Sequence, residues 1–360
     1  MSAKRSLAFG SLLGAAMLVS TAAASLHAAA PQVRYAIVST TSTTEVTFPS
    51  AVVAATGDGQ GGFFASLGVE VVHVESSGAI DPAFSYAATA PRRVGQLALA
   101  PGSRLVVVES GGAPVQVAIV SATTGVLQHL GPQLVGSRRS ASGIATIGST
   151  AYIAGSFRSV VGGPRRTGVV AVNTATGAVL PFNPLLDHDA SGIATTAGRI
   201  YLTGAFRTVG GQPRAHLAAV APNGRALAWR PQLPRVPEVA SLAAGPHAVF
   251  ATTFHRVLAL RADDGRRLSW GKALSDAYRY LEPTSALYQG AVLYLGNTAG
   301  PFTVTWRGAK REGGCIGIDT RSGDPTPWKV KLPGLVTRTC IPLATSADAV
   351  LVTGRFAPVA

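Results

Sequence analysis

Short apolar runs, rich in valine, alanine and threonine, alternate with glycine-marked turns along most of the chain. The clearest four runs are Gly143–Ile147, Ala151–Phe157, Gly168–Asn173 and Ala178–Phe182. Such residues favour β-strands, and a glycine such as Gly177 supplies the positive φ that a tight turn between two strands requires. The pattern therefore predicts a sheet of four antiparallel strands, lettered here from a (innermost) to d (outermost).

This unit occurs twice, with a spacing of 49 positions. The pentapeptide Ser-Gly-Ile-Ala-Thr stands at Ser142–Thr146 and again at Ser191–Thr195, and Tyr152 returns as Tyr201. The same spacing relates Gly155, Phe157, Arg158, Val160, Gly162, Pro164 and Arg165 to Gly204, Phe206, Arg207, Val209, Gly211, Pro213 and Arg214. A fixed period of this length, built of short strands, is typical of a β-propeller blade.

The rest of the chain can be aligned with this unit. Blade copies are expected near 57–90, 91–135, 140–187, 188–235, 236–275, 280–332 and 335–360. The last copy has only two strands, at Thr339–Leu343 and Ala349–Phe356, and the stretch 33–56 offers the missing ones at Val33–Ser39 and Thr44–Phe48. We therefore predict an all-β, seven-bladed β-propeller of four-stranded antiparallel blades, closed by pairing of the N- and C-terminal strands. Six or eight blades, a β-helix and an open stack remain alternatives.

An aromatic residue follows the c–d turn glycine by five places in four copies. These residues are Phe182, Trp229, Trp270 and Trp328, after Gly177, Gly224, Gly265 and Gly323. The rings could form a stacking platform for sugars or bases. We favour the interpretation that each packs between neighbouring blades, because buried aromatics contribute large apolar area to repeat cores.

The N-terminus has the composition of a signal peptide, assigned to 1–29, which leaves a single propeller domain at 31–360. Lys4 and Arg5 precede the apolar stretch Leu7–Val19, and cleavage is expected after Ala24 or within Ala28–Ala30. No later segment reaches the ~18 apolar residues of a membrane-spanning helix. The chain is therefore expected to be secreted, extracellular or held in the cell envelope. A disulfide between Cys315 and Cys340 fits that compartment, and two buried free thiols are the alternative.

The phrase Tyr201–Arg214, its earlier copy Tyr152–Arg165, and the glycine turn that leads to Trp229 resemble the delta-60 class of bacterial exported propeller repeats. The resemblance implies blades of about 50 residues and no assigned chemistry. A weaker similarity to quinoprotein-type propellers rests on three residues, Ala171, Thr176 and Gly177. Asn173 replaces the expected aspartate, and Phe182 lies one place late.

The formal net charge of +14 indicates attraction to anions. The b–c loops and d–a linkers are expected on one face, called the top face, and the a–b and c–d turns on the opposite face, called the turn face. More of the basic loop residues fall on the top face than on the turn face. An insertion at Gly300–Gly314 is expected to form a long top-face loop of the kind that often binds ligands. The candidate ligand-binding residues are Trp306, Arg307, Lys310, Arg311, Arg166, Arg138 and Arg139. Arg158, Arg207, Arg165 and Arg214 recur with the repeat and are expected to clamp loops through backbone carbonyls.

No catalytic residue, metal site or cofactor is predicted. The run Asp187-His188-Asp189 is interpreted as a solvated turn, and His73, His129, His216, His247 and His255 have no partner at ligand spacing. We expect a non-catalytic binding or scaffold module for an anionic polysaccharide, a cell-wall polymer or another protein, with no specific nucleic-acid motif. The alternatives are an exported propeller enzyme, such as a polysaccharide lyase or hydrolase or a quinoprotein-like enzyme, and a structural module of a surface assembly.

Overall fold

The computed structural model describes most of the chain. The described residues are 33–112, 114–136, 141–196, 198–231, 239–253, 256–271, 283–297, 303–306, 309–312, 315–328, 330 and 335–356. They belong to one compact unit, Gln32–Ala360, and the predicted signal peptide lies outside them. Within the described ranges, no helix combines the length and apolar character that crossing a bilayer requires.

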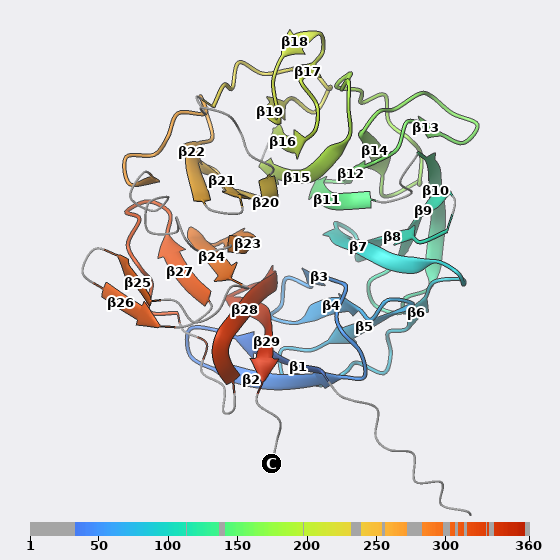
Figure 1. Ribbon diagram of the computed structural model, residues 1–360. Helices are drawn as coiled ribbons and strands as arrows, with labels where there is room; N and C mark the ends of the chain where they lie inside the picture. The colour runs from blue at the N-terminus through green and yellow to red at the C-terminus, as the bar shows by residue number, and fades with distance from the viewer. Residues whose placement is uncertain are drawn as a thin grey trace, which may run out of the picture. The chain divides into compact units, whose positions relative to one another are not determined.

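The chain forms a series of small antiparallel sheets, drawn in chain order in Figure 1. The first contains β3 (Ala54–Gly57), β4 (Phe63–Ser66), β5 (Glu70–Val74) and β6 (Tyr86–Ala87). The second contains β7 (Arg93–Ala100), β8 (Arg104–Ser110), β9 (Val115–Ser121) and β10 (Leu127–Val135), with β13 (Ser159–Val160) at its edge. Each of these sheets therefore has the four strands predicted for a blade.

The duplicated unit forms two sheets of the same design. One contains β11 (Ala141–Ile147), β12 (Thr150–Gly155) and β14 (Val169–Asn173); the other contains β15 (Ala190–Thr196), β16 (Arg199–Gly204) and β19 (Leu217–Val220). The short strands β17 (Thr208–Val209) and β18 (Gln212–Pro213) pair in a loop of the second unit. Both sheets have a bulge at the start of the first strand, and Tyr152 pairs with Ala145 as Tyr201 pairs with Ala194. The sequence repeat is thus a repeat of strand register.

The next sheets complete the chain. One contains β20 (Val239–Ala244), β21 (Ala248–Thr253) and β22 (Arg256–Arg261). A larger sheet joins β23 (Pro283–Gln289), β24 (Val292–Asn297) and β27 (Cys315–Asp319) to β28 (Leu335–Ser346), β29 (Ala349–Phe356), β1 (Val33–Val38) and β2 (Thr43–Phe48). The insertion holds the two-stranded β25 (Thr303–Trp306) and β26 (Ala309–Glu312), so it is a hairpin where we expected a long loop.

The predicted fourth strands of several copies are shorter than expected. After Gly177 the outer segment makes one bridge, Val172↔Val179, which is flanked by two backbone hydrogen bonds, from Asn173 to Ala178 and from Leu180 to Ala171. Single bridges also replace the outer strand at Val220↔Ala226, Leu260↔Arg267 and Ile318↔Pro325. In the first case Pro181 follows, and proline has no N–H to extend the ladder. The chain then turns its aromatic residue inward.

Those aromatic residues are buried, as the core interpretation predicted. Phe182, Trp229, Trp270 and Trp328 are at most 5% exposed. Each ring lies against an aromatic ring of a second strand, with centroid distances of 5.0 Å to Tyr152, 5.2 Å to Tyr201, 6.1 Å to Phe250 and 4.9 Å to Tyr294, respectively. Trp229 also shares a cluster with Val249 and Leu258 of the next sheet. The rings therefore fill the space between successive sheets.

The N- and C-terminal segments pair as predicted. Strand β1 pairs antiparallel with β29 on one side, through Tyr35↔Thr353, and with β2 on the other. Cys315 and Cys340 form the predicted disulfide between β27 and β28, with the two Cα atoms 5.4 Å apart. The first strands of the seven predicted blade copies also contact one another in the order β3, β7, β11, β15, β20, β23 and β28, and β28 contacts β3.

Candidate functional site

The predicted ligand-binding residues fall into three groups. Arg138, Arg139 and Arg307 lie outside the described residues. The backbone of Trp306, Lys310 and Arg311 lies in the β25–β26 hairpin, paired with Ala309, Thr305 and Val304, respectively. Arg166 precedes β14, in a different sheet, and is only 9% exposed.

The guanidinium of Arg166 forms a hydrogen bond within its own loop. Its Nη1 donates to the carbonyl of Arg165 at 2.9 Å, and Arg214 makes the corresponding bond to Pro213 at 2.8 Å. The backbone N–H of Arg166 donates to Arg158, as that of Arg214 does to Arg207. The structural counterpart of Arg214 is therefore Arg166, and the pairing of Arg165 with Arg214 by sequence spacing was wrong. The loop before β14 in the earlier copy is one residue longer than the loop before β19. The counterpart of Arg214 is therefore Arg166, one residue later than the 49-residue spacing predicts.

One pocket of the described residues opens on the turn face. It has a volume of about 380 Å³ and lies among the turns that follow β15, β20 and β22, with the end of β23 beside them. Its lining residues are Thr195, Thr196, Arg199, Tyr201, Ala244, Gly245, Pro246, Ala262, Asp263 and Tyr288. This pocket therefore lies on the face opposite to the one where basic loop residues are most numerous.

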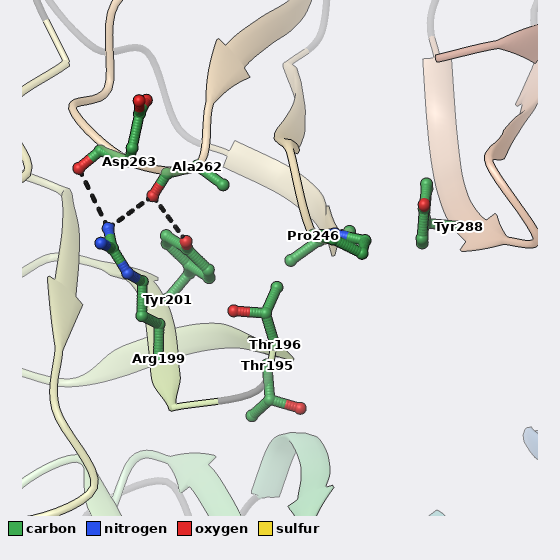
Figure 2. A pocket seen from close by; sticks show the side chains of 10 residues that line it. Thr195, Thr196, Arg199, Tyr201, Pro246, Ala262, Asp263 and Tyr288 are labelled. Atoms are coloured by element: carbon green, nitrogen blue, oxygen red, sulfur yellow. Dashed lines mark hydrogen bonds between the residues drawn. The ribbon is translucent and has the colours of Figure 1, made fainter. Parts of the chain in front are cut away.

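One wall of this pocket is held by hydrogen bonds from the duplicated unit to the next sheet. Arg199 Nη1 donates to the carbonyls of Ala262 at 2.7 Å and Asp263 at 3.0 Å. The hydroxyl of Tyr201 donates to the same Ala262 carbonyl at 2.9 Å, and burial raises the pKa of that hydroxyl. Figure 2 shows both side chains reaching this turn from one side, with Pro246 and Tyr288 lying across the pocket. The turn Ala262–Asp263 is fixed before any ligand arrives.

The opposite wall depends on a glycine. A Cβ atom at Gly245 would lie 2.3 Å from the Cζ atom of Tyr288, so only glycine leaves room for the ring. The Tyr288 ring also stacks on Phe250, with a centroid distance of 6.5 Å and an interplanar angle of 19°. Tyr288 is therefore held between a backbone turn and a core ring.

The acidic group of the pocket is neutralised locally. Asp263 accepts a hydrogen bond from Arg261 Nε at 2.9 Å, and this interaction lowers the pKa of Asp263 and raises that of Arg261. Asp264 lies 3.5 Å from the same guanidinium. Among the described residues, no carboxylate lies within ion-pair distance of the Arg199 guanidinium. The pocket therefore carries one cation without a carboxylate counterion.

A second pocket of about 310 Å³ adjoins the first. It is lined by Pro246, His247, Arg261, Asp263 and Leu268. Pro246 and Asp263 line both pockets, so the turn after β20 and the turn after β22 separate two adjacent chambers.

Sequence reasoning missed a polar cluster around His73. Its Nε2 lies 3.2 Å from Asp58 Oδ2 and its Nδ1 lies 3.0 Å from Asp81 Oδ2, two partners that are not at metal-ligand spacing in the sequence. Ser346 Oγ donates to Asp58 Oδ1 at 2.8 Å and joins β28 to the first sheet. The ring stacks on Phe64 at 4.6 Å. Strand pairing creates these contacts, and no fixed spacing in the sequence signals them.

The run Asp187-His188-Asp189 does not converge on one point. Asp187 Oδ1 accepts hydrogen bonds from the backbone N–H groups of Arg207 and Thr208, at 2.9 and 3.0 Å. Asp189 instead forms an ion pair with Arg158 at 3.1 Å. The two carboxylates act as loop anchors.

No protein-family model matches the chain, and no curated protein matches it. A chain in the crystal structure of the mitotic checkpoint complex is similar in structure, with a TM-score of 0.54 and 12% identity over 98% of this chain and 99% of that one. The extracellular domain of BT4673 from B. thetaiotaomicron gives a TM-score of 0.53 and 11% identity over 84% of this chain, which spans 38% of that one. The computationally designed Ika8 protein gives a TM-score of 0.51 and 11% identity, over 85% of this chain and 96% of that one. Together with the small antiparallel sheets, these likenesses define a β-propeller-like all-β fold.

Proposed function

We propose that the protein is a non-catalytic binding module, secreted or displayed at the cell surface, that recognises an anionic partner. The observation that carries this proposal is the excess of 31 lysine and arginine residues over 17 aspartate and glutamate residues. Such an excess raises the local concentration of anions and speeds their association. The extracellular setting is supported by the disulfide and by the likeness in fold to an extracellular domain.

We further propose that the sheets form a closed seven-bladed ring. Support comes from the contacts of the seven first strands in chain order, with β28 beside β3, and from the pairing of β1 with β29. Closure by joining the chain ends removes exposed strand edges, which otherwise invite aggregation. A rigid ring would hold its loops and turns in fixed positions for binding.

Retention on immobilised polysaccharide tests the proposed function. The purified chain should bind a uronate polymer and fail to bind a neutral polymer of the same length. Because solvent-exposed charges are screened over about 8 Å at physiological ionic strength and about 3 Å at 1 M salt, binding should weaken steeply as salt rises. Equal retention on both polymers would contradict the proposal. Release of shortened product during the incubation would favour an enzyme instead.

A further inference from the structure

We propose that the two chambers on the turn face are adjacent subsites for carboxylate-bearing sugars, either free or within a polymer. This inference rests on the proposed function and gives it a location and a ligand class. It departs from the sequence-based expectation, which placed binding at the top face.

The dimensions favour a small ligand that extends across both chambers. Volumes of about 380 and 310 Å³ lie at the lower end of the range for small-molecule pockets, about 300–1,000 Å³. Because Pro246 and Asp263 line both chambers, the two chambers are immediate neighbours. Two linked sugar units match this arrangement better than one bulky group.

The lining favours a polyhydroxylated ligand. Four residues with hydroxyl groups line the first chamber: Thr195, Thr196, Tyr201 and Tyr288. The hydroxyls of Tyr201 and Thr195 already donate to backbone carbonyls, and Pro246 and the Tyr288 ring contribute apolar surface. Hydroxyl groups both donate and accept hydrogen bonds, which suits the hydroxyls of a sugar ring. A purely apolar ligand would leave the polar groups of this wall unpaired, at a cost in binding free energy.

The charges favour a carboxylate over a phosphate. Both hydrogen bonds from Arg199 to the turn come from Nη1, so they do not use Nη2 of the same guanidinium. Arginine forms strong charge-assisted hydrogen bonds with carboxylates. The carboxylates of Asp263 and Asp264 are already paired with Arg261 and Arg266, which leaves Arg199 to balance a ligand in the first chamber. A single negative charge in the first chamber therefore fits better than a dianionic phosphate, and Arg261 and His247 line the second chamber.

The site is rigid before binding. Hydrogen bonds fix Arg199 and Tyr201 against the turn Ala262–Asp263, and Gly245 and Phe250 hold the Tyr288 ring. A preorganised site loses less conformational freedom on binding, which favours affinity for small ligands.

Calorimetric titration of the purified chain with digalacturonate tests the assignment, with its neutral methyl ester as the matched ligand. We expect digalacturonate to bind at least tenfold more tightly than the ester. Arg199→Gln should weaken binding of the acid by about tenfold or more and leave binding of the ester nearly unchanged, because it removes a charge-assisted bond. Tyr288→Phe should weaken the binding of both ligands by a few-fold. Arg165→Gln is the matched control, since Arg165 is exposed in the loop before β14, at the opposite end of the strands.

Thermal unfolding of each variant shows whether the fold survives, and Tyr288→Phe keeps the test decisive if Arg199→Gln destabilises the turn. Loss of binding in Arg165→Gln with full binding in both pocket variants would overturn the turn-face site and leave the proposed function standing. Equal affinity for the acid and the ester would overturn the carboxylate preference. If polyglutamate or a DNA oligonucleotide competed with digalacturonate for binding as strongly as a uronate oligomer does, the assignment of the ligand as a sugar would be overturned. Absence of binding to any anion would remove the proposed function as well.

Discussion

The junction between the two duplicated sheets and the junction at the chain ends are held together differently. The duplicated sheets share an apolar cluster that includes Tyr152, Phe182 and Leu202, all at most 3% exposed. The first sheet and the terminal strands also share an apolar cluster, which includes Tyr35, Phe63 and Leu351. This junction has further polar and covalent links, from the Asp58–His73–Asp81 cluster, from Ser346 and from the disulfide between β27 and β28. Hydroxyl-to-carbonyl bonds, such as Thr195 to Thr146 at 3.0 Å, add polar links to the duplicated junction.

The difference follows from sequence divergence. Near-identical units present matching surfaces, so ordinary core packing can join them. The sheets at the chain ends are assembled from segments that no longer resemble one another. Ionic and covalent links between them add to the apolar packing at that junction. Substitutions that remove one packing contact, ionic link, disulfide or hydrogen bond at a time test this difference.

The largest effect is expected from Trp229→Ala. Trp229 is fully buried, and its Nε1 donates to the carbonyl of Arg261 at 2.8 Å. Removing such a side chain from a core should lower the free energy of unfolding by about 3–5 kcal/mol. Urea denaturation measures the change. Trp328→Ala is the matched variant near the chain ends, because Trp328 donates to Val38 at 3.3 Å. Trp229 packs between the second duplicated sheet and the sheet of β20–β22. If Trp229→Ala cost less than loss of the disulfide, packing would not be the main source of stability at that junction.

The next effect is expected from the double change Cys315→Ser and Cys340→Ser. The disulfide closes a loop with a sequence separation of 25, and loss of that constraint should cost about 3 kcal/mol. Reduction of the wild-type chain with dithiothreitol should give the same shift in the urea midpoint. A shift below about 0.5 kcal/mol would show that the terminal junction does not depend on this link.

The His73 cluster should make stability depend on pH. Burial acts to raise the pKa of Asp58, but hydrogen bonds from Gln60, Ser346, His73 and Gly62 outweigh it and lower the pKa. The hydrogen bond to His73 likewise lowers the pKa of Asp81. These groups therefore contribute stability that is present above their unfolded pKa, near 4, and is lost as the pH falls through the folded values.

Denaturation between pH 2 and pH 7 checks this dependence. The wild-type chain should lose stability more steeply below about pH 4 than His73→Gln, which removes the partner of both carboxylates. Asp58→Asn should cost about 1–3 kcal/mol at pH 7, because it disrupts a buried hydrogen-bond network. Identical pH profiles for the wild type and His73→Gln would show that the cluster is not coupled to folding.

The smallest effect is expected at the duplicated junction. Thr195→Val removes the hydroxyl that donates to Thr146 and keeps the side-chain shape. The cost should be about 0.5–1.5 kcal/mol, the usual net value of one hydrogen bond. A cost above that of Asp58→Asn would reverse the comparison.

Much of the fold could be predicted from the sequence because its signals are local and repeated. The pentapeptides at Ser142 and Ser191, and the aromatic residues after the turn glycines, carry both the strand register and the core positions. The incomplete last copy correctly predicted the partner of β1. The shortened outer strands escaped prediction because the aromatic residue that ends them also resembles a strand residue.

The candidate site could not be predicted in the same way. Arg199, Gly245 and Tyr288 come from three different copies and share no spacing. Charge sorting counted arginines on each face and could not tell that Arg166 bonds to its own loop. The His73 cluster likewise joins Asp58 to Ser346, 288 positions apart in the chain. Contacts between neighbouring sheets bring these groups together.

A crystal structure of the full chain with a bound uronate oligomer tests the central claim most directly. We expect seven sheets around one axis, with β28 beside β3, and a ligand carboxylate bonded to Arg199 on the turn face. A different number of sheets, or a ligand bound at the opposite face away from Arg199, would contradict it.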